Sequence, residues 1–187
     1  MGVPQGSILG PLFFSIYVND LPNAVSTSDI SMFADDTELH YCHGDLSTVQ
    51  CTLQADLENI SVWLRVNRLK LNVSKSHCML IGSRQRIGGK CLHLLLNGDT
   101  LRQVSSTKYL GIHIDQHLTW NTHIDYILNR VKLYCINRLR PVSPKILRLL
   151  YQAYIMRILD YCDVVWSPCG DTPIGFIAFC THLTLCG

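Results

Sequence analysis

Residues 30–42 read ISMFADDTELHYC. An apolar run leads to two adjacent acids, Asp35 and Asp36, and a second short run, Leu39 to Cys42, follows them. Two strand-like runs around a polar centre are typical of a β-hairpin. The sequence therefore predicts a hairpin whose tip carries both carboxylates.

A helix is expected on each side of this hairpin. Downstream, apolar residues recur every three or four positions behind Asp45, a candidate N-cap, which predicts an amphipathic helix. Upstream, the apolar run Ile8 to Leu21 predicts a buried helix that begins beyond Gly10 and Pro11 and lies under a sheet. The downstream apolar positions are Leu46, Val49, Leu53, Leu57, Ile60 and Leu64.

The middle of the chain indicates further strands. Residues 78–81 form a compact apolar run bounded by glycine. The pair Asn97-Gly98 predicts a tight turn between strands at 92–96 and 100–104, because these residues tolerate positive φ angles. Several short strands of this kind predict a β-sheet.

The last third of the chain becomes helical. Residues 109–114 predict one more strand, after which helical spacing resumes behind Thr119 and a new helix begins at Ser143-Pro144. Strands followed by helices are typical of an α+β fold. We expect a boundary near residue 116, with a mixed region over 1–116, a helical region over 117–166 and a divergent tail over 167–187.

Charge is unevenly distributed along the chain. Residues 1–60 contain eight acids and no Lys or Arg, a formal charge of −8, and the remainder carries +10, which together give the net charge of +2. An acidic part can hold cations and a basic part can hold a polyanion, so the division suits metal-dependent chemistry on nucleic acid. A chance partition of solvated charges is the alternative.

Composition favours a folded intracellular protein. Hydrophobic residues make up 48% of the chain and charged residues 16%, unlike a disordered protein. Nine cysteines, an odd number without any Cys-x-x-Cys pair, favour reduced thiols, and no pair of histidines has convincing zinc-ligand spacing. The apolar run at 8–18 is a poor signal peptide and too short to span a bilayer. We expect a location in the nucleus or cytoplasm, without secretion.

The adjacent acids suit a divalent-metal site. Nucleotidyl transfer uses two ions about 3.5–4 Å apart, which hard oxygen ligands hold. Mg²⁺ is usually bound by one or two protein carboxylates together with phosphates and water, and Mn²⁺ accepts similar ligands. Asp35 and Asp36 meet that description. Taken alone, such a pair is more often a solvated turn, so the assignment depends on the surrounding sequence.

Three ordered motifs supply that context. They are Gly2-Val3-Pro4-Gln5-Gly6-Ser7, then Met32-Phe33-Ala34-Asp35-Asp36-Thr37, then Lys108-Tyr109-Leu110-Gly111. With this order and spacing, residues 2–166 resemble the reverse transcriptases of non-LTR (LINE-type, jockey/CR1-like) retrotransposons. The resemblance implies a partial polymerase palm followed by a helical, thumb-like region. It also implies RNA template, DNA primer and dNTP as partners of the intact enzyme.

The resemblance assigns roles to the central motif. Asp35 and Asp36 match the paired catalytic carboxylates of the metal site, with Asp35 as the direct ligand of Mg²⁺. Phe33 would pack beside the primer end.

Other matched residues have plainer alternatives. Gln5 and Gly6 match the loop that lies against the incoming nucleotide and template, or they form an ordinary helix-entry turn. Lys75 matches a lysine near the triphosphate, or it is a solvated surface lysine. Leu110 and Gly111 match the turn that supports the primer, or they are a plain strand end.

Basic residues of the helical region could contact the phosphates of a template and primer duplex without reading its sequence, although solvated helix faces carry similar charges. These residues are Arg130, Lys132, Arg138, Arg140, Lys145, Arg148 and Arg157.

The chain also departs from the family pattern. The family takes a further metal-binding Asp from a strand upstream of the Pro-Gln-Gly loop, and Met1 stands close to that loop here. From about Cys169 onward the sequence does not continue the family's helix. We therefore expect this chain to be inactive alone. A non-catalytic nucleic-acid-binding remnant and a decayed gene product are the alternative interpretations.

Overall fold

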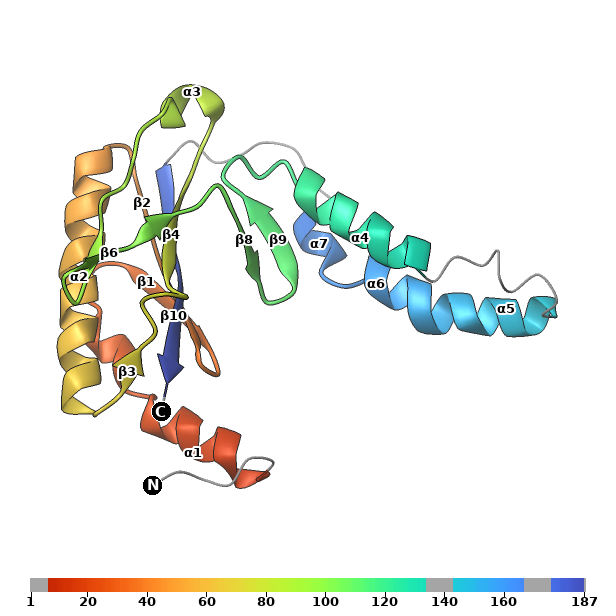
Figure 1. Cartoon of the computed structure of the whole chain (residues 1–187), viewed down its shortest axis with the longest axis horizontal. Helices are drawn as coiled ribbons and strands as arrows, with labels where there is room; N and C mark the ends of the chain where they lie inside the picture. The colour runs from red at the N-terminus through yellow and green to blue at the C-terminus, as the bar shows by residue number, and fades with distance from the viewer. Residues whose placement is uncertain (1–6, 134–142, 167–175, 187) are drawn as a thin grey trace. The chain divides into compact units, whose positions relative to one another are not determined.

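The computed structural model describes residues 7–133, 143–166 and 176–186, the last of these as backbone. The chain divides into two compact units (Figure 1). The first comprises Met1–Ser105 together with Pro173–Gly187, and the second comprises Ser106–Thr172. The α+β prediction agrees with this mixture of helices and small sheets. Within the described ranges, no helix is long and apolar enough to cross a membrane.

A six-stranded sheet forms the centre of the first unit. Its order is β1-β2-β10-β4-β7, with β3 paired to the end of β10. Strand β10 runs antiparallel to both β2 and β4, whereas β4 and β7 are parallel. The strands are β1 (Asp29–Phe33), β2 (Asp36–His43), β3 (Lys70–Leu71), β4 (His77–Ile81), β7 (Arg102–Gln103) and β10 (Phe176–Cys186).

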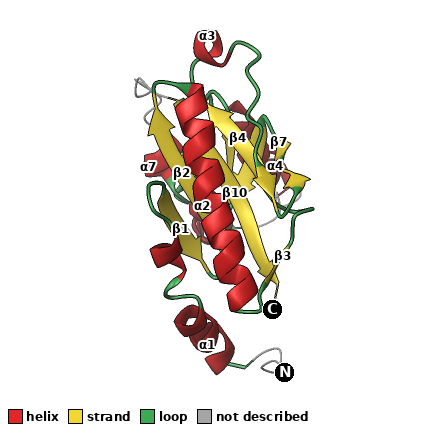
Figure 2. Ribbon diagram, turned by 90° about the vertical axis from the view of Figure 1, so that its left-hand side faces the viewer, coloured by secondary structure: helices red, strands yellow, loops and turns green. Residues whose placement is uncertain are grey.

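Helix α2 (Leu46–Val66) covers one face of this sheet (Figure 2). The predicted helix and its cap are confirmed, because the Asp45 carboxylate accepts a hydrogen bond from the Thr48 N–H at 3.0 Å. Hydrogen bonds from Ser47 and Thr48 lower the pKa of Asp45 to about 2. Burial of each fully buried aliphatic side chain stabilises the fold by about 1.5–3 kcal/mol. The buried apolar residues of α2 are Val49, Leu53, Leu57, Ile60 and Leu64.

A buried carboxylate on α2 fixes the segment that leads into β1. Asp56 accepts hydrogen bonds from the N–H groups of Ser26 and Ser28, each at 2.8 Å, and from the Ser28 hydroxyl at 2.6 Å. Burial acts to raise the pKa of Asp56, but these hydrogen bonds outweigh it and lower the pKa. The entry to the hairpin is therefore tied to the long helix.

The predicted β4 strand and the Asn97-Gly98 turn are also confirmed. Strands β5 (Leu95–Leu96) and β6 (Asp99–Thr100) flank that turn, where Asn97 and Gly98 have φ of 54° and 91°. The strands are shorter than predicted, because the chain beyond β6 turns away to pair β7 with β4. Between β4 and β5 lies one turn of helix, α3 (Arg84–Ile87).

The predicted buried helix in the acidic part is wrong on two points. Helix α1 (Leu9–Tyr17) begins before Gly10 and Pro11. Proline is tolerated in the first turn of a helix, because the N–H group that it lacks would have no partner within the helix there. Helix α1 also has no buried residue: Phe14 packs against the core, but Leu9, Leu12, Phe13, Ile16 and Tyr17 all remain about half exposed or more. A short 3-10 turn, η1 (Leu21–Ala24), follows.

The second unit contains a small hairpin and a series of helices. Its elements are β8 (Ser106–Tyr109), β9 (Ile112–Asp115), α4 (Asn121–Leu133), α5 (Pro144–Leu150), a π-helical segment η3 (Tyr151–Met156), α6 (Arg157–Leu159) and α7 (Asp163–Trp166). The strand predicted at 109–114 is confirmed only in part: Ile112–Asp115 form β9, but Leu110 and Gly111 both have positive φ and form a turn before it. Helix α5 starts at Pro144 as predicted.

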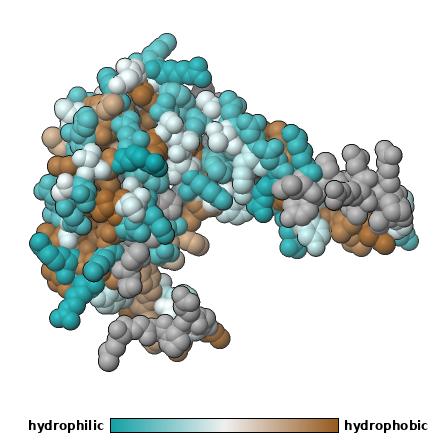
Figure 3. Space-filling model, viewed as in Figure 1, coloured by the Kyte–Doolittle hydropathy of each residue, from teal (hydrophilic) through white to brown (hydrophobic). Residues whose placement is uncertain are grey.

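Histidines form part of the interior of the second unit. The His123 ring is 2% exposed, and its Nδ1 accepts the N–H of His113 at 3.3 Å. Tyr126 lies 4.7 Å from His113 between ring centroids. Burial lowers the pKa of both histidines, because it disfavours the charged form. Apolar surface is left on helices α1 and α5, as the brown areas in Figure 3 show.

Candidate metal and nucleotide site

The two acids lie at the tip of the β1–β2 hairpin, as predicted. The register pairs Phe33 with Asp36, which leaves Ala34 and Asp35 as a two-residue turn. Ala34 has φ of 53°, a conformation that usually falls to glycine at the first position of such turns. An L-residue there costs about 1–2 kcal/mol. The tip is thus held in a strained conformation by the paired strands behind it.

The tip is open to solvent while its base is buried. Phe33 is 62% exposed and Asp35 is also exposed, whereas Asp36 is half-buried. Directly after the tip, Thr37, Glu38 and Leu39 are buried at 1%, 4% and 0% exposure. The two carboxylates therefore stand at a solvent-open tip whose base is buried.

The donor set fits Mg²⁺ in part. Adjacent carboxylates are the hard oxygen ligands that Mg²⁺ prefers. In the part of the chain that the structure describes, however, no group of three or more His, Cys, Asp or Glu residues is placed to hold a metal ion. The neighbouring strand β10 supplies no further acid, since Leu183 stands opposite Thr37 and Thr184 opposite Asp36.

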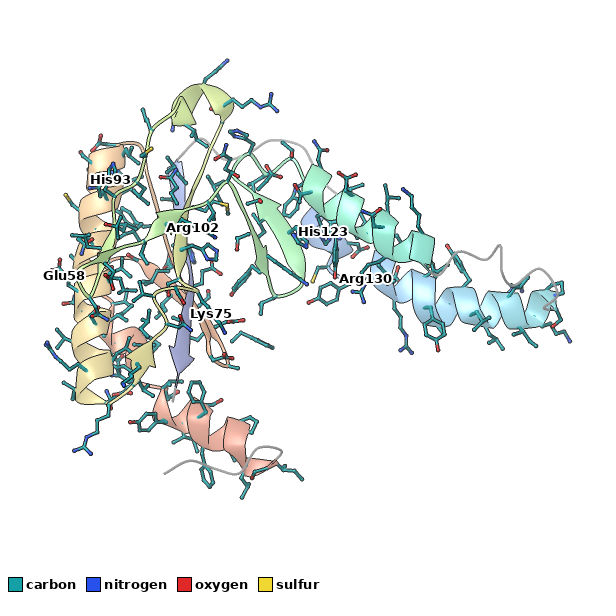
Figure 4. All side chains as sticks on the ribbon, viewed as in Figure 1. Glu58, Lys75, His93, Arg102, His123 and Arg130 are labelled. Carbon is teal, nitrogen blue, oxygen red and sulfur yellow. The ribbon has the colours of Figure 1, made fainter. Side chains whose placement is uncertain are left out.

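Lys75 belongs to the same unit as the acids. It lies on the turn between β3 and β4, where its N–H donates to the Asn72 carbonyl at 3.1 Å and its side chain is exposed (Figure 4). An exposed ammonium on a short turn can reach a phosphate group. Gln5 and Gly6 lie outside the described residues.

The Leu110-Gly111 turn belongs to the second unit, so the structure does not place it relative to the acids. Leu110 and Gly111 have φ of 43° and 92°, and the Tyr161 hydroxyl donates to the Leu110 carbonyl at 2.6 Å. A Cβ on Gly111 would lie 3.2 Å from Cε1 of Tyr161. Backbone conformation and close ring packing both require glycine there.

A basic groove lies on the first unit, and the sequence did not single it out. It has a volume of about 820 Å³ and runs between the C-terminal half of α2, β3 and the β5–β6 turn. Arg65, Arg68 and Lys70 line it together with one acid, Glu58. These three are the first basic residues of the chain, and their close spacing was the available signal.

The basic residues of the second unit are only partly described. Arg138 and Arg140 lie outside the described residues. Arg130 donates to the Tyr126 hydroxyl at 3.1 Å, and Lys108 lies 5.1 Å from the centre of that ring. The Tyr126 ring thus holds two cations close together.

The model of the family described as reverse transcriptase (RNA-dependent DNA polymerase) matches residues 1–114, and the chain belongs to that family.

Similar curated proteins come from non-LTR elements of insects, which confirms the resemblance seen in the sequence. The RNA-directed DNA polymerase from mobile element jockey of Drosophila melanogaster is 31% identical over 133 residues, 67% of this chain and 14% of that protein. The probable RNA-directed DNA polymerase from transposon BS of the same organism is 29% identical over 181 residues, 89% of this chain and 20% of that protein. The chain thus spans a fifth or less of the length of these relatives. No solved structure matches it.

Replacement of Gly111 by alanine tests the turn of the second unit. We expect Gly111→Ala to lower the free energy of unfolding by about 1–3 kcal/mol, because it adds backbone strain and forces Tyr161 to move. Urea unfolding followed by circular dichroism measures the change. Gly89→Ala is the matched control, since Gly89 also has a positive φ but no atom near its added Cβ. An effect at Gly111 no larger than at Gly89 would show that the ring contact is unimportant.

Proposed function

We propose that this chain is part of an RNA-directed DNA polymerase of a non-LTR retrotransposon. Asp35 and Asp36 belong to its metal site, and the isolated chain does not polymerise. The observation that carries the proposal is the pair of carboxylates at the solvent-open tip of a hairpin with a buried base. Family membership supports the reaction class. We assign residues 1–116 to the palm and 117–166 to a thumb-like region.

Each residue of the candidate site has its own role in nucleotidyl transfer. When bound at Asp35 and Asp36, divalent ions such as Mg²⁺ supply charge stabilisation for the attacking hydroxyl and the departing pyrophosphate. Asp35, which lies in the turn, would be the direct ligand of the ion, and the carboxylate of Asp36 would help to neutralise the ion's positive charge. Phe33 offers an exposed ring beside the primer end, and Lys75 offers an ammonium to the triphosphate. Gln5 and Gly6 would lie against the nucleotide and template.

The proposed inactivity follows from the number of ligands. Two ions that share a small site need several anionic ligands to offset their mutual repulsion. In the described part of the chain the tip carries two acids, and the residue on β10 that lies opposite Asp36 is a threonine. Metal affinity and control of the leaving phosphate should therefore both be weak.

Primer extension tests the proposal. The full chain is incubated with an RNA template, a DNA primer, dNTPs and Mg²⁺, and we expect no incorporation above a blank. Incorporation that disappears in the Asp35→Ala variant would overturn the proposed inactivity while supporting the metal assignment. Incorporation that is unaffected by Asp35→Ala would contradict the assignment of Asp35 to the metal site.

A second candidate function is nucleic-acid binding without catalysis, and the basic groove favours it. Arg65, Arg68 and Lys70 outnumber the single acid Glu58 there, and the groove is of the size of ligand sites in general. Contacts to phosphates would make binding independent of sequence and strongly dependent on salt.

The groove's role can be separated from that of the metal site. We expect the double variant Arg65→Ala, Arg68→Ala to weaken binding of an RNA–DNA duplex about tenfold at low salt and to reduce the slope of affinity against salt concentration, because about two phosphate contacts are lost. Fluorescence anisotropy measures both quantities. The control pair Arg84→Ala, Arg86→Ala carries the same charge change on α3, outside the groove. Equal losses of affinity in the two double variants would show that the groove contributes only through the general positive charge of the chain.

A further inference from the structure

Strand β10 is the central member of the sheet. It pairs with β2 from Phe176 to Thr184 and with β4 from Ile177 to Thr181, and β2 does not pair with β4 directly. If β10 left this position, the ladder hydrogen-bonding groups of β2 and β4 would lose their partners. Unpaired backbone groups of this kind readily accept another strand.

The covalent connection of β10 differs from its packing. By contacts it belongs to the first unit, but along the chain it follows the second unit, Ser106–Thr172, through which alone it is joined to the other strands. The register places Cys180 opposite both Leu39 and Cys78. Hydrogen bonds of a strand ladder are the same whether the strand comes from its own chain or from another copy, so exchange of an identical element costs little.

The segment itself is suited to such exchange. Its sequence from residue 176 to residue 186, FIAFCTHLTLC, contains no Asp, Glu, Lys, Arg or Pro and is rich in strand-favouring residues. No charge or proline therefore opposes its pairing with another molecule's sheet.

We propose that the position between β2 and β4 is a strand-acceptor site that takes residues 176–186 of a second copy of this chain, giving a strand-exchanged dimer. In that dimer the partner's strand lies beside Asp36, because residue 184 stands opposite it. The candidate metal site of each copy is then flanked by the other copy. The proposal does not depend on the polymerase assignment.

A disulfide at a register position reports which chain supplies the strand. Ile177 stands opposite Cys42, whose thiol is exposed, so the variant Ile177→Cys sets two thiols at directly opposed positions. The Cα atoms of opposed residues lie within the range that a disulfide spans. Ala178→Cys is the matched control, because that position is opposite Tyr41 and Leu80.

Each full-length variant is refolded and oxidised at two concentrations that differ about a hundredfold, so that mass action separates the two arrangements. Mass spectrometry of linked peptides then counts the bonds between Cys42 and position 177 within and between chains. We expect bonds within one chain in dilute solution and bonds between chains to predominate in concentrated solution. Bonds confined to one chain at both concentrations, no bond at all, or equal linkage of Cys42 in the Ala178→Cys control would overturn the proposal.

Discussion

The backbone pairing of β10 holds the first unit together. This strand joins β2 to β4, and β2 carries Asp36 at its first position, so the place of the acids depends on a strand from near the other end of the chain. The buried Asp56 carboxylate then fixes the entry to β1 through the N–H groups of Ser26 and Ser28. Sheet pairing and one buried carboxylate together position the exposed tip.

Local features of the fold could be predicted from the sequence, because each has a short-range cause. The period of apolar residues and the Asp45 cap predicted α2, and the two apolar runs around Asp35 and Asp36 predicted the hairpin. The Asn97-Gly98 turn followed from its tolerance of positive φ. In the candidate site, the location of the two acids at the hairpin tip was therefore predictable.

Features with long-range causes could not be predicted in this way. Nothing local to residues 176–186 indicates pairing with strands more than ninety residues away, as in the pair Cys78 and Cys180. The exposure of α1 was missed because an apolar run predicts burial without saying what covers it. The basic groove depends on how α2, β3 and the β5–β6 turn meet, which only a folded chain shows. At Leu110 and Gly111 the family resemblance indicated a turn, whereas the apolar pattern predicted a continuous strand, because leucine seldom adopts a positive φ.

Binding of Mn²⁺ by the full chain tests whether the hairpin tip holds a divalent ion weakly through Asp35 and Asp36. Free Mn²⁺ is followed by electron paramagnetic resonance in the unchanged chain and in the Asp35→Asn, Asp36→Asn and Asp29→Asn variants. Asp29 lies at the far end of the same hairpin, opposite His40, and serves as the control. We predict that Asp35→Asn and Asp36→Asn each weaken binding by about tenfold or more, because each removes an anionic ligand, and that Asp29→Asn does not. Equal affinity in all four proteins would show that neither Asp35 nor Asp36 is a ligand of the ion.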